Sequence, residues 1–250
     1  MITDQTFPEF KRHAVEPIEC LKRGWDLIKD QYWLFVGMSL ITIIIGSAVP
    51  FGILMGPMMC GLNLAFLQRM DRKTVEFGTL FKGFDYFGDG LIAALLHYIP
   101  MMLIIAPFYV AIVLAQIAMM ASRDRGGEPN PAALVGFFSV FAIGFPIMMI
   151  LIVVLSIGFA FAYPLIVDRR LAGLNAVKLS FKAGMANFWR LFGLLFLNGL
   201  LAFVGVLFCY VGLIFVLPIT FAALAVAYQQ VFGVAPIQSL YPPPPPASFT

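Results

Sequence analysis

Charged residues are scarce in this chain. They make up 12% of its 250 residues, whereas hydrophobic residues reach 61%, and soluble domains carry about twice that share of charge. The mean hydropathy is +0.94 and the net charge is only +3. So little charge in so apolar a chain excludes a soluble enzyme, a nucleic-acid-binding protein and a disordered chain. The composition therefore predicts an integral membrane protein.

The motifs of several enzyme classes are absent as well. The sequence has no G-x-S-x-G, H-E-x-x-H or P-loop pattern. Its three cysteines, Cys20, Cys60 and Cys209, share no close spacing, so neither a zinc site nor a disulfide framework is indicated. The apolar stretches contain no Asp, Glu, Lys or Arg, which argues against proton-coupled transporters, voltage sensors and charge-lined channels. We therefore expect no enzymatic activity, no cofactor and no metal.

Four uncharged stretches predict six transmembrane helices. A spanning helix needs about 20 mostly apolar residues. Stretch 31–68 is broken near its middle by glycines and prolines, and stretch 191–232 divides at two glycines, so each would hold two helices. The other two stretches would each form one kinked helix. The expected spans lie near 32–50, 52–68, 91–121 and 133–167, and on either side of Gly205 and Gly212.

The positions of the basic residues support this count. Cytoplasmic segments of membrane proteins carry an excess of Lys and Arg. With six spans and a cytoplasmic N-terminus, only Arg123 and Arg125 of the 16 basic residues would lie outside. A single pass through 31–68, or two passes through 133–167, would place a basic segment on the outer face. We therefore expect an all-α protein of the cytoplasmic (inner) membrane with both termini cytoplasmic.

An internal repeat subdivides the expected membrane domain. Residues 19–37 align with 175–193 without a gap, and a weaker third copy begins at Phe77. The clearest matches pair Lys22 with Lys178, Trp33 with Trp189 and Gly37 with Gly193. Each copy precedes two expected spans, which predicts three units, each an interfacial helix followed by a transmembrane hairpin.

The repeat sets the domain boundaries. The three units would cover 15–68, 74–167 and 172–232, and together form one domain over 15–232. This domain would lie between a cytoplasmic N-terminal segment, 1–14, and a proline-rich cytoplasmic tail, 233–250, which contains five consecutive prolines after Tyr241.

Each predicted unit begins with an amphipathic helix. Its apolar residues recur every three or four positions, and its cations occupy the other side. Such helices lie in the headgroup plane with aromatic faces inward and basic faces toward anionic lipid. They either only anchor and orient the spans, or form a collar that contacts headgroups or a protein partner. The apolar stripes are Ile18, Leu21, Trp25, Ile28 and Tyr32; Phe77, Leu80, Phe81, Phe84 and Phe87; and Leu174, Val177, Phe181, Met185 and Phe188.

Several segments together resemble a known family. They are Tyr163–Asp168 with Leu171, Ala176, Lys178 and Ser180, then Asn187–Trp189, the turn Gly56-Pro57 with Gly61, and Phe81–Phe84. Over nearly its whole length the chain resembles uncharacterised bacterial multi-pass inner-membrane proteins, similar to the membrane domain fused to some glycerophosphodiester phosphodiesterases. The resemblance implies a six-helix all-α membrane fold. It supplies no catalytic residues, and we expect no soluble phosphodiesterase domain within these 250 residues.

Three functions fit these features. The first is a non-enzymatic scaffold or modulator of a membrane-associated partner. The second is a carrier of lipid or hydrophobic solute, with a Phe- and Met-lined cavity between the hairpins. The third is an enzyme acting on headgroups through Asp168, Arg169 and Arg170. We expect the first, with anionic headgroups or a cytoplasmic protein contacted by Lys22, Arg23, Lys82, Arg169, Arg170, Lys178 and Lys182.

Overall fold

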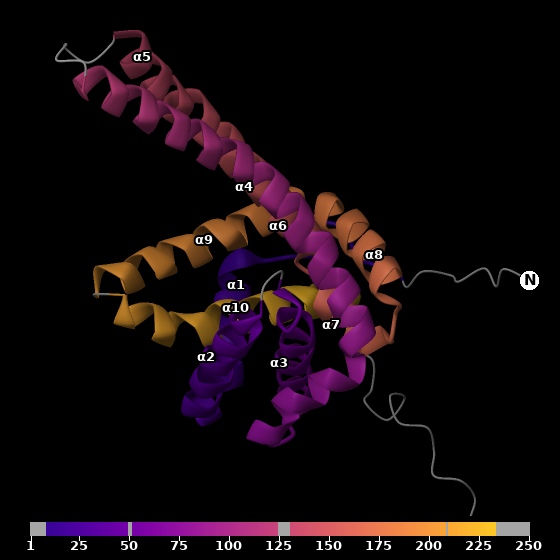
Figure 1. Cartoon of the computed structure of the whole chain (residues 1–250). Helices are drawn as coiled ribbons and strands as arrows, with labels where there is room; N and C mark the ends of the chain where they lie inside the picture. The colour runs from indigo at the N-terminus through magenta and orange to yellow at the C-terminus, as the bar shows by residue number, and fades with distance from the viewer. Residues whose placement is uncertain (1–8, 50–51, 125–130, 209, 234–250) are drawn as a thin grey trace, which may run out of the picture. The chain divides into compact units, whose positions relative to one another are not determined.

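In the computed structural model, the described residues are 9–49, 52–124, 131–208 and 210–233, and they contain helices but no strands (Figure 1). The α-helices are α1 (Pro17–Ile28), α2 (Tyr32–Ala48), α3 (Met55–Met70), α4 (Phe87–Asp124), α5 (Pro131–Ser139), α6 (Phe145–Phe159), α7 (Ala162–Arg169), α8 (Gly173–Ala186), α9 (Phe188–Leu207) and α10 (Val211–Phe232). Two 3-10 helices, η1 (Lys29–Gln31) and η3 (Phe77–Tyr86), and a π-helix, η4 (Val140–Gly144), complete the set.

Five helical segments of the described residues are long and apolar enough to cross a membrane. They are Pro17–Ala48, Phe77–Ala121, Val135–Arg169, Phe188–Leu207 and Val211–Phe232. The helix expected near 52–68 is present as α3, but it has only 16 residues. At 1.5 Å per residue it measures about 24 Å, less than the roughly 30 Å of a bilayer core. The chain is therefore a helical protein whose long helices suit a membrane.

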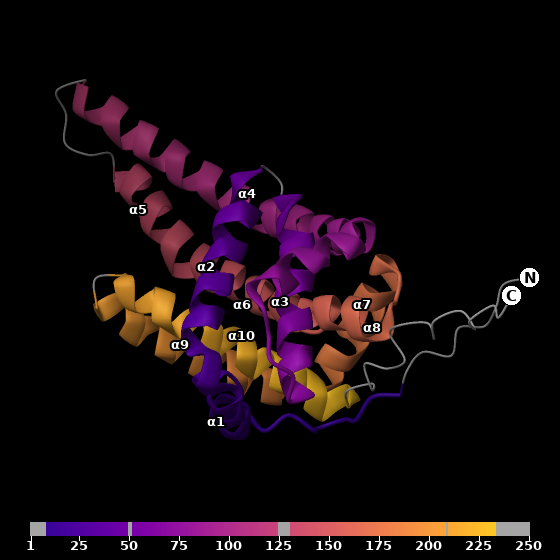
Figure 2. The same ribbon diagram turned by 90° about the horizontal axis from the view of Figure 1, so that it is seen from below.

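The chain divides into two compact units, which are described separately. Unit 1 comprises 1–95 and 157–250, and unit 2 comprises 96–156. In unit 1, α2 and α3 lie side by side and run antiparallel (Figure 2), as do α9 and α10 (Figure 1). At the centre of the unit α3 packs against α7 and α10, and the Tyr228 hydroxyl of α10 bonds to Asp168 of α7. The side chains of Phe66, Leu165 and Tyr228 on these helices are buried, as is Phe161, which precedes α7 and contacts Tyr228.

Three shorter elements surround this centre, and we call α1, η3 and α8 the pre-membrane elements. η3 packs against α3, the helix before it, and α8 packs against α7 and the end of α6. α1, the first described helix, packs against α10, the last. Both η3 and α8 therefore contact the helix that precedes them along the chain, and α1 completes this cyclic order by contacting the last helix. Each element is also preceded by a residue in the left-handed region: His13, Arg72 and Arg170.

Glycine permits the closest of these contacts. A Cβ on Gly61 of α3 would collide with the carbonyl oxygen of Leu80 in η3. A Cβ on Gly24 of α1 would lie 2.9 Å from the backbone nitrogen of Ala223 in α10. A Cβ on Gly184 of α8 would collide with the carbonyl oxygen of Ile157 in α6. Small residues at helix interfaces allow backbones to approach in this way, and all three pre-membrane elements are thus held at backbone-to-backbone distance.

The structure modifies the expected stripe of α1. Ile28 is buried, but Ile18 and Trp25 are 63% and 44% exposed. The residues of α1 that face the protein are Cys20, Gly24 and Ile28. Two small residues and Ile28, none of them aromatic, therefore form the buried face of the helix.

Two expected helices have altered geometry. The second pre-membrane element is a 3-10 helix, not an α-helix. The kinked helix expected over 133–167 contains the π-helix η4 just before Pro146, and it breaks between α6 and α7. Proline explains the π-helix and the break in this second helix, since it cannot donate the backbone hydrogen bond of a continuous α-helix. Pro146 follows the π-helix, and Pro164 follows the break between α6 and α7.

Unit 2 consists of most of α4 with α5, η4 and most of α6. The single long helix expected over 91–121 is present as α4, with Pro100 and Pro107 inside it. Aromatic contacts within the unit include those of Phe141 with Phe108 and Phe137. Cys209, Arg125 and the tail 234–250, each named in the sequence predictions, lie outside the described residues.

Candidate functional site

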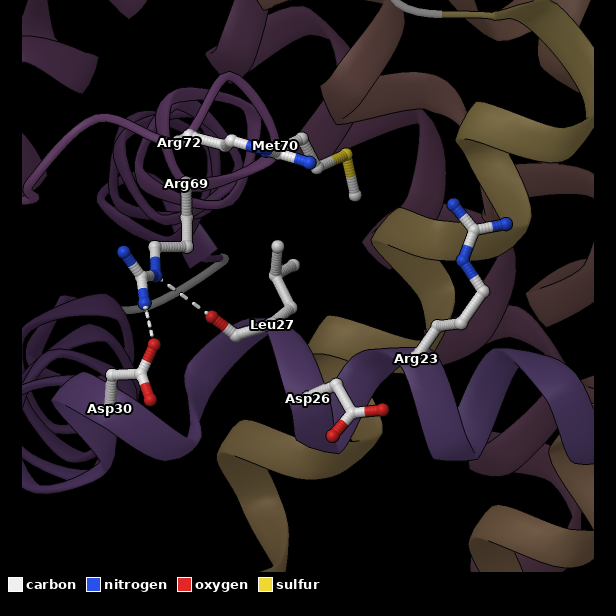
Figure 3. Close-up of a pocket in the computed structure, with 7 residues that line it drawn as sticks. All are labelled: Arg23, Asp26, Leu27, Asp30, Arg69, Met70 and Arg72. Atoms are coloured by element: carbon white, nitrogen blue, oxygen red, sulfur yellow. Dashed lines mark hydrogen bonds and ion pairs between the residues drawn. The ribbon is translucent and has the colours of Figure 1, made fainter.

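A charged pocket of about 470 Å³ opens on unit 1 between α1, η1 and the end of α3 (Figure 3). Three arginines and two aspartates surround it, and two apolar side chains complete its wall. The lining residues are Arg23, Asp26, Leu27, Asp30, Arg69, Met70 and Arg72. This concentration of guanidinium groups makes the pocket the candidate site, because guanidinium binds carboxylate and phosphate groups with two parallel hydrogen bonds.

Arg69 joins the two sides of the pocket. Its Nε donates a hydrogen bond of 2.9 Å to the carbonyl oxygen of Leu27, in the last turn of α1, where helical carbonyls lack partners. Its Nη2 lies 2.5 Å from Oδ2 of Asp30, and Figure 3 shows the side chain directed at both acceptors. The Arg69 side chain is only 17% exposed. Arg69 therefore ties α3 to α1, with its charge compensated within the pocket wall.

Arg23 and Arg72 are the arginines available to a ligand. Both are exposed. Arg23 donates a hydrogen bond from Nη2 to the neutral amide of Gln229, at 2.9 Å, and in Figure 3 it points away from Arg69. Arg72 has a left-handed backbone, with φ 59°, directly after α3. Neither forms an ion pair with any described residue. The pocket therefore presents two uncompensated positive charges.

Of the seven residues predicted to contact headgroups or a partner, only Arg23 lines this pocket. Lys22, Lys82, Lys178 and Lys182 are exposed on the pre-membrane elements, and Arg170 is exposed after α7. The structure adds Arg69 and Arg72, which the sequence reasoning placed among the cytoplasmic cations but did not single out. Their position at the end of α3, directly before the second pre-membrane element, was the available signal.

Arg169 belongs to a different cluster. Its Nε lies 3.1 Å from Oδ2 of Asp168, and its Nη2 donates to the carbonyl oxygen of Phe232 at 3.0 Å. The Tyr228 hydroxyl donates to the same Asp168 oxygen at 2.6 Å. Asp168 is 2% exposed and Tyr228 is fully buried. The cluster joins α7 to α10, and the Asp168 carboxylate faces the protein interior instead of a headgroup.

Metal chemistry has no evident site in the part of the chain that the structure describes. No group of three or more His, Cys, Asp or Glu side chains is placed to hold an ion there. Cys20 and Cys60 are both buried and form no disulfide with a described residue. The Cys20 thiol donates to Oε1 of Gln230 at 3.1 Å.

Comparisons with known proteins identify no relative. No family model, no curated protein and no solved structure matches the chain. The resemblance to the membrane domain of glycerophosphodiester phosphodiesterases therefore stays a prediction.

Proposed function

We propose that the chain is a non-enzymatic, multi-pass protein of the cytoplasmic membrane that holds an acidic partner at its cytoplasmic face. The binding surface is the pocket between α1 and α3, extended by the exposed cations of the pre-membrane elements. The observation that carries the proposal is the lack of compensation of these charges. Six exposed cations form no ion pair with any described residue: Arg23, Arg72, Lys22, Lys82, Lys178 and Lys182.

The cyclic order of these contacts, in which η3 contacts α3, α8 contacts α7 and α1 contacts α10, supports the proposed topology. That topology has three repeated units, six spans and cytoplasmic termini. In this topology, α1, η3 and α8 all lie on the cytoplasmic side, because each precedes an outward-going span. The α3 helix would then be the second span of the first hairpin, which is short and buried over most of its length. Reporter fusions after residue 126 and at the C-terminus test this: only the first should be active as an exported reporter.

A filled centre favours a scaffold over a carrier of lipid or hydrophobic solute. A carrier needs a cavity between its helices. Where α3 meets its neighbours in unit 1, Met58, Leu62 and Phe66 are 0–1% exposed, and Phe66 stacks on Phe35 with ring centroids 5.0 Å apart. Close packing of this kind leaves no room for an apolar solute between α2 and α3.

The test is native mass spectrometry of the full-length protein extracted gently from its own membrane. The double variant Arg23→Gln/Arg72→Gln should lose a protein adduct that the wild type retains. The matched control is Lys11→Gln/Arg12→Gln, which removes the same charge from two exposed residues outside the pocket, and it should keep the adduct.

Three outcomes are distinguishable. Loss of the protein adduct in the pocket variant alone supports the proposal. Equal loss in both variants means that overall positive charge, and not this pocket, holds the partner. A wild type that retains no protein overturns the scaffold, whether or not it retains lipid.

A further inference from the structure

A second groove lies where α1 passes through η1 into α2, and it shares Asp30 with the arginine pocket. Its volume is about 670 Å³. Four aromatic side chains line it, Tyr32 among them, and the other three, Trp33, Trp25 and Phe77, are 72%, 44% and 40% exposed. Beside them stand one ammonium group, Lys29, and two carboxylates, Asp30 and Glu76.

The walls of the groove are held in place by bonds to distant parts of unit 1. Gln31 donates from Nε2 to the carbonyl oxygen of Val75 at 3.0 Å and accepts from the Val75 N–H at 3.1 Å. The Tyr32 hydroxyl donates to the carbonyl oxygen of Phe215 at 2.7 Å. The Tyr32 ring lies 5.3 Å from Trp25 and 5.7 Å from Trp33, edge to face in both cases. A groove that is already ordered loses little entropy when it binds a ligand.

The charges in the groove suit a ligand with both signs. Glu76 forms no ion pair with a described residue, and Asp30 uses Oδ2 for Arg69 while its side chain remains 65% exposed. Lys29 is paired with Asp26 but is 49% exposed. A ligand cation would therefore meet carboxylates and the faces of tryptophan rings, the arrangement that binds quaternary ammonium groups. A ligand anion would meet Lys29.

We propose that this groove binds the headgroup of one zwitterionic phospholipid, with its cationic amine between Glu76 and the rings of Trp25 and Trp33 and its phosphate near Lys29. A lipid is favoured over a soluble amine because the groove lies at the start of α2, which is apolar from Tyr32 to Ala48. Where that helix enters a bilayer, the groove lies at headgroup depth. The proposal uses residues outside the partner-binding cations and does not rest on that function.

The experiment is native mass spectrometry of the purified full-length protein in mild detergent, with dioleoylphosphatidylcholine or dioleoylphosphatidylglycerol added at equal concentration. The wild type should form a one-to-one complex preferentially with the choline lipid. Trp33→Leu should weaken that complex about fivefold. Trp189→Leu is the matched control: Trp189 aligns with Trp33, begins a span as Trp33 does and is 79% exposed, but does not line the groove. It should leave the complex unchanged.

Glu76→Gln separates amine recognition from loss of folding, because the side chain is exposed and keeps its shape. It should weaken the complex with the choline lipid and leave the weaker complex with the glycerol lipid as it was. Equal binding of the two lipids by the wild type would overturn the proposal. Equal weakening by Trp33→Leu and Trp189→Leu would overturn it too, since both tryptophans would then act only as general interfacial anchors.

Discussion

The two units of this molecule both contain long apolar helices, but the helices within each unit are held together differently. Unit 1 joins its elements by polar bonds and by close backbone approach: Asp168 with Tyr228, and Gly24 against Ala223. In unit 2, the Ser139 hydroxyl bonds back to Gly136 of its own helix, and large side chains such as Leu103 and Met120 are 70% and 69% exposed.

This difference shows where lipid would replace protein as the surroundings of an apolar side chain. Lipid chains are as apolar as leucine, so hydrophobicity alone gives membrane helices no reason to associate. Helices that bury their side chains therefore need small residues or hydrogen bonds, and unit 1 has both. We expect unit 1 to be sensitive to conservative substitutions that unit 2 tolerates, and three matched pairs test this.

The largest contrast is expected from glycine. Gly61→Ala places a Cβ against the Leu80 carbonyl in unit 1, and overpacking against backbone should cost about 3 kcal/mol of unfolding free energy. Gly136→Ala in unit 2 meets nothing within 4 Å and should be neutral or slightly stabilising, since alanine favours helix. Denaturant unfolding in detergent micelles measures both. If the two variants unfold alike, the close contact of α3 with η3 does not hold unit 1 together.

A hydroxyl gives the next contrast. Tyr228→Phe removes the donor at 2.6 Å from the buried Asp168 carboxylate, and a buried hydrogen bond to a charged group is worth about 2 kcal/mol. Tyr109→Phe removes the same atom from a side chain in unit 2 that is 66% exposed, so its unfolding free energy should stay at the wild-type value. A neutral Tyr228→Phe would show that the Asp168 carboxylate does not depend on the Tyr228 hydroxyl.

The sequence predicts where the helices lie along the chain better than it predicts which of their residues pack against other helices. Hydropathy locates α4 as one long helix, and the glycines near 205 and 212 separate α9 from α10. It does not predict that α1 buries Cys20 and Gly24 while Trp25 stays exposed. Apolar character distinguishes membrane from water, but not lipid from protein, and the small residues that mark protein contacts carry little hydropathy signal.

The candidate site could not be predicted from the sequence for a related reason. Charge placement predicts which face of the membrane the arginines share. Only the structure shows that Arg69 binds Leu27 and Asp30, whereas Arg23 and Arg72 form no ion pair with a described residue. Likewise, Asp168 lies at the edge of an apolar stretch, where sequence suggests a surface position. Its burial depends on Tyr228, which is 60 residues away.

The smallest contrast compares two serines. In unit 1 the Ser180 hydroxyl donates to the carbonyl oxygen of Gly158 at 2.6 Å and accepts from the N–H of Phe161 at 3.1 Å, and so bonds both sides of the break between α6 and α7. Ser180→Ala leaves these two buried backbone groups without that partner and should cost about 1 kcal/mol. Ser139→Ala in unit 2 loses only a bond of 2.9 Å to its own exposed helix and should be within experimental error of the wild type. If Ser180→Ala is equally silent, the Ser180 hydroxyl does not hold the break, and hydrogen bonding between elements would not explain the greater sensitivity expected of unit 1.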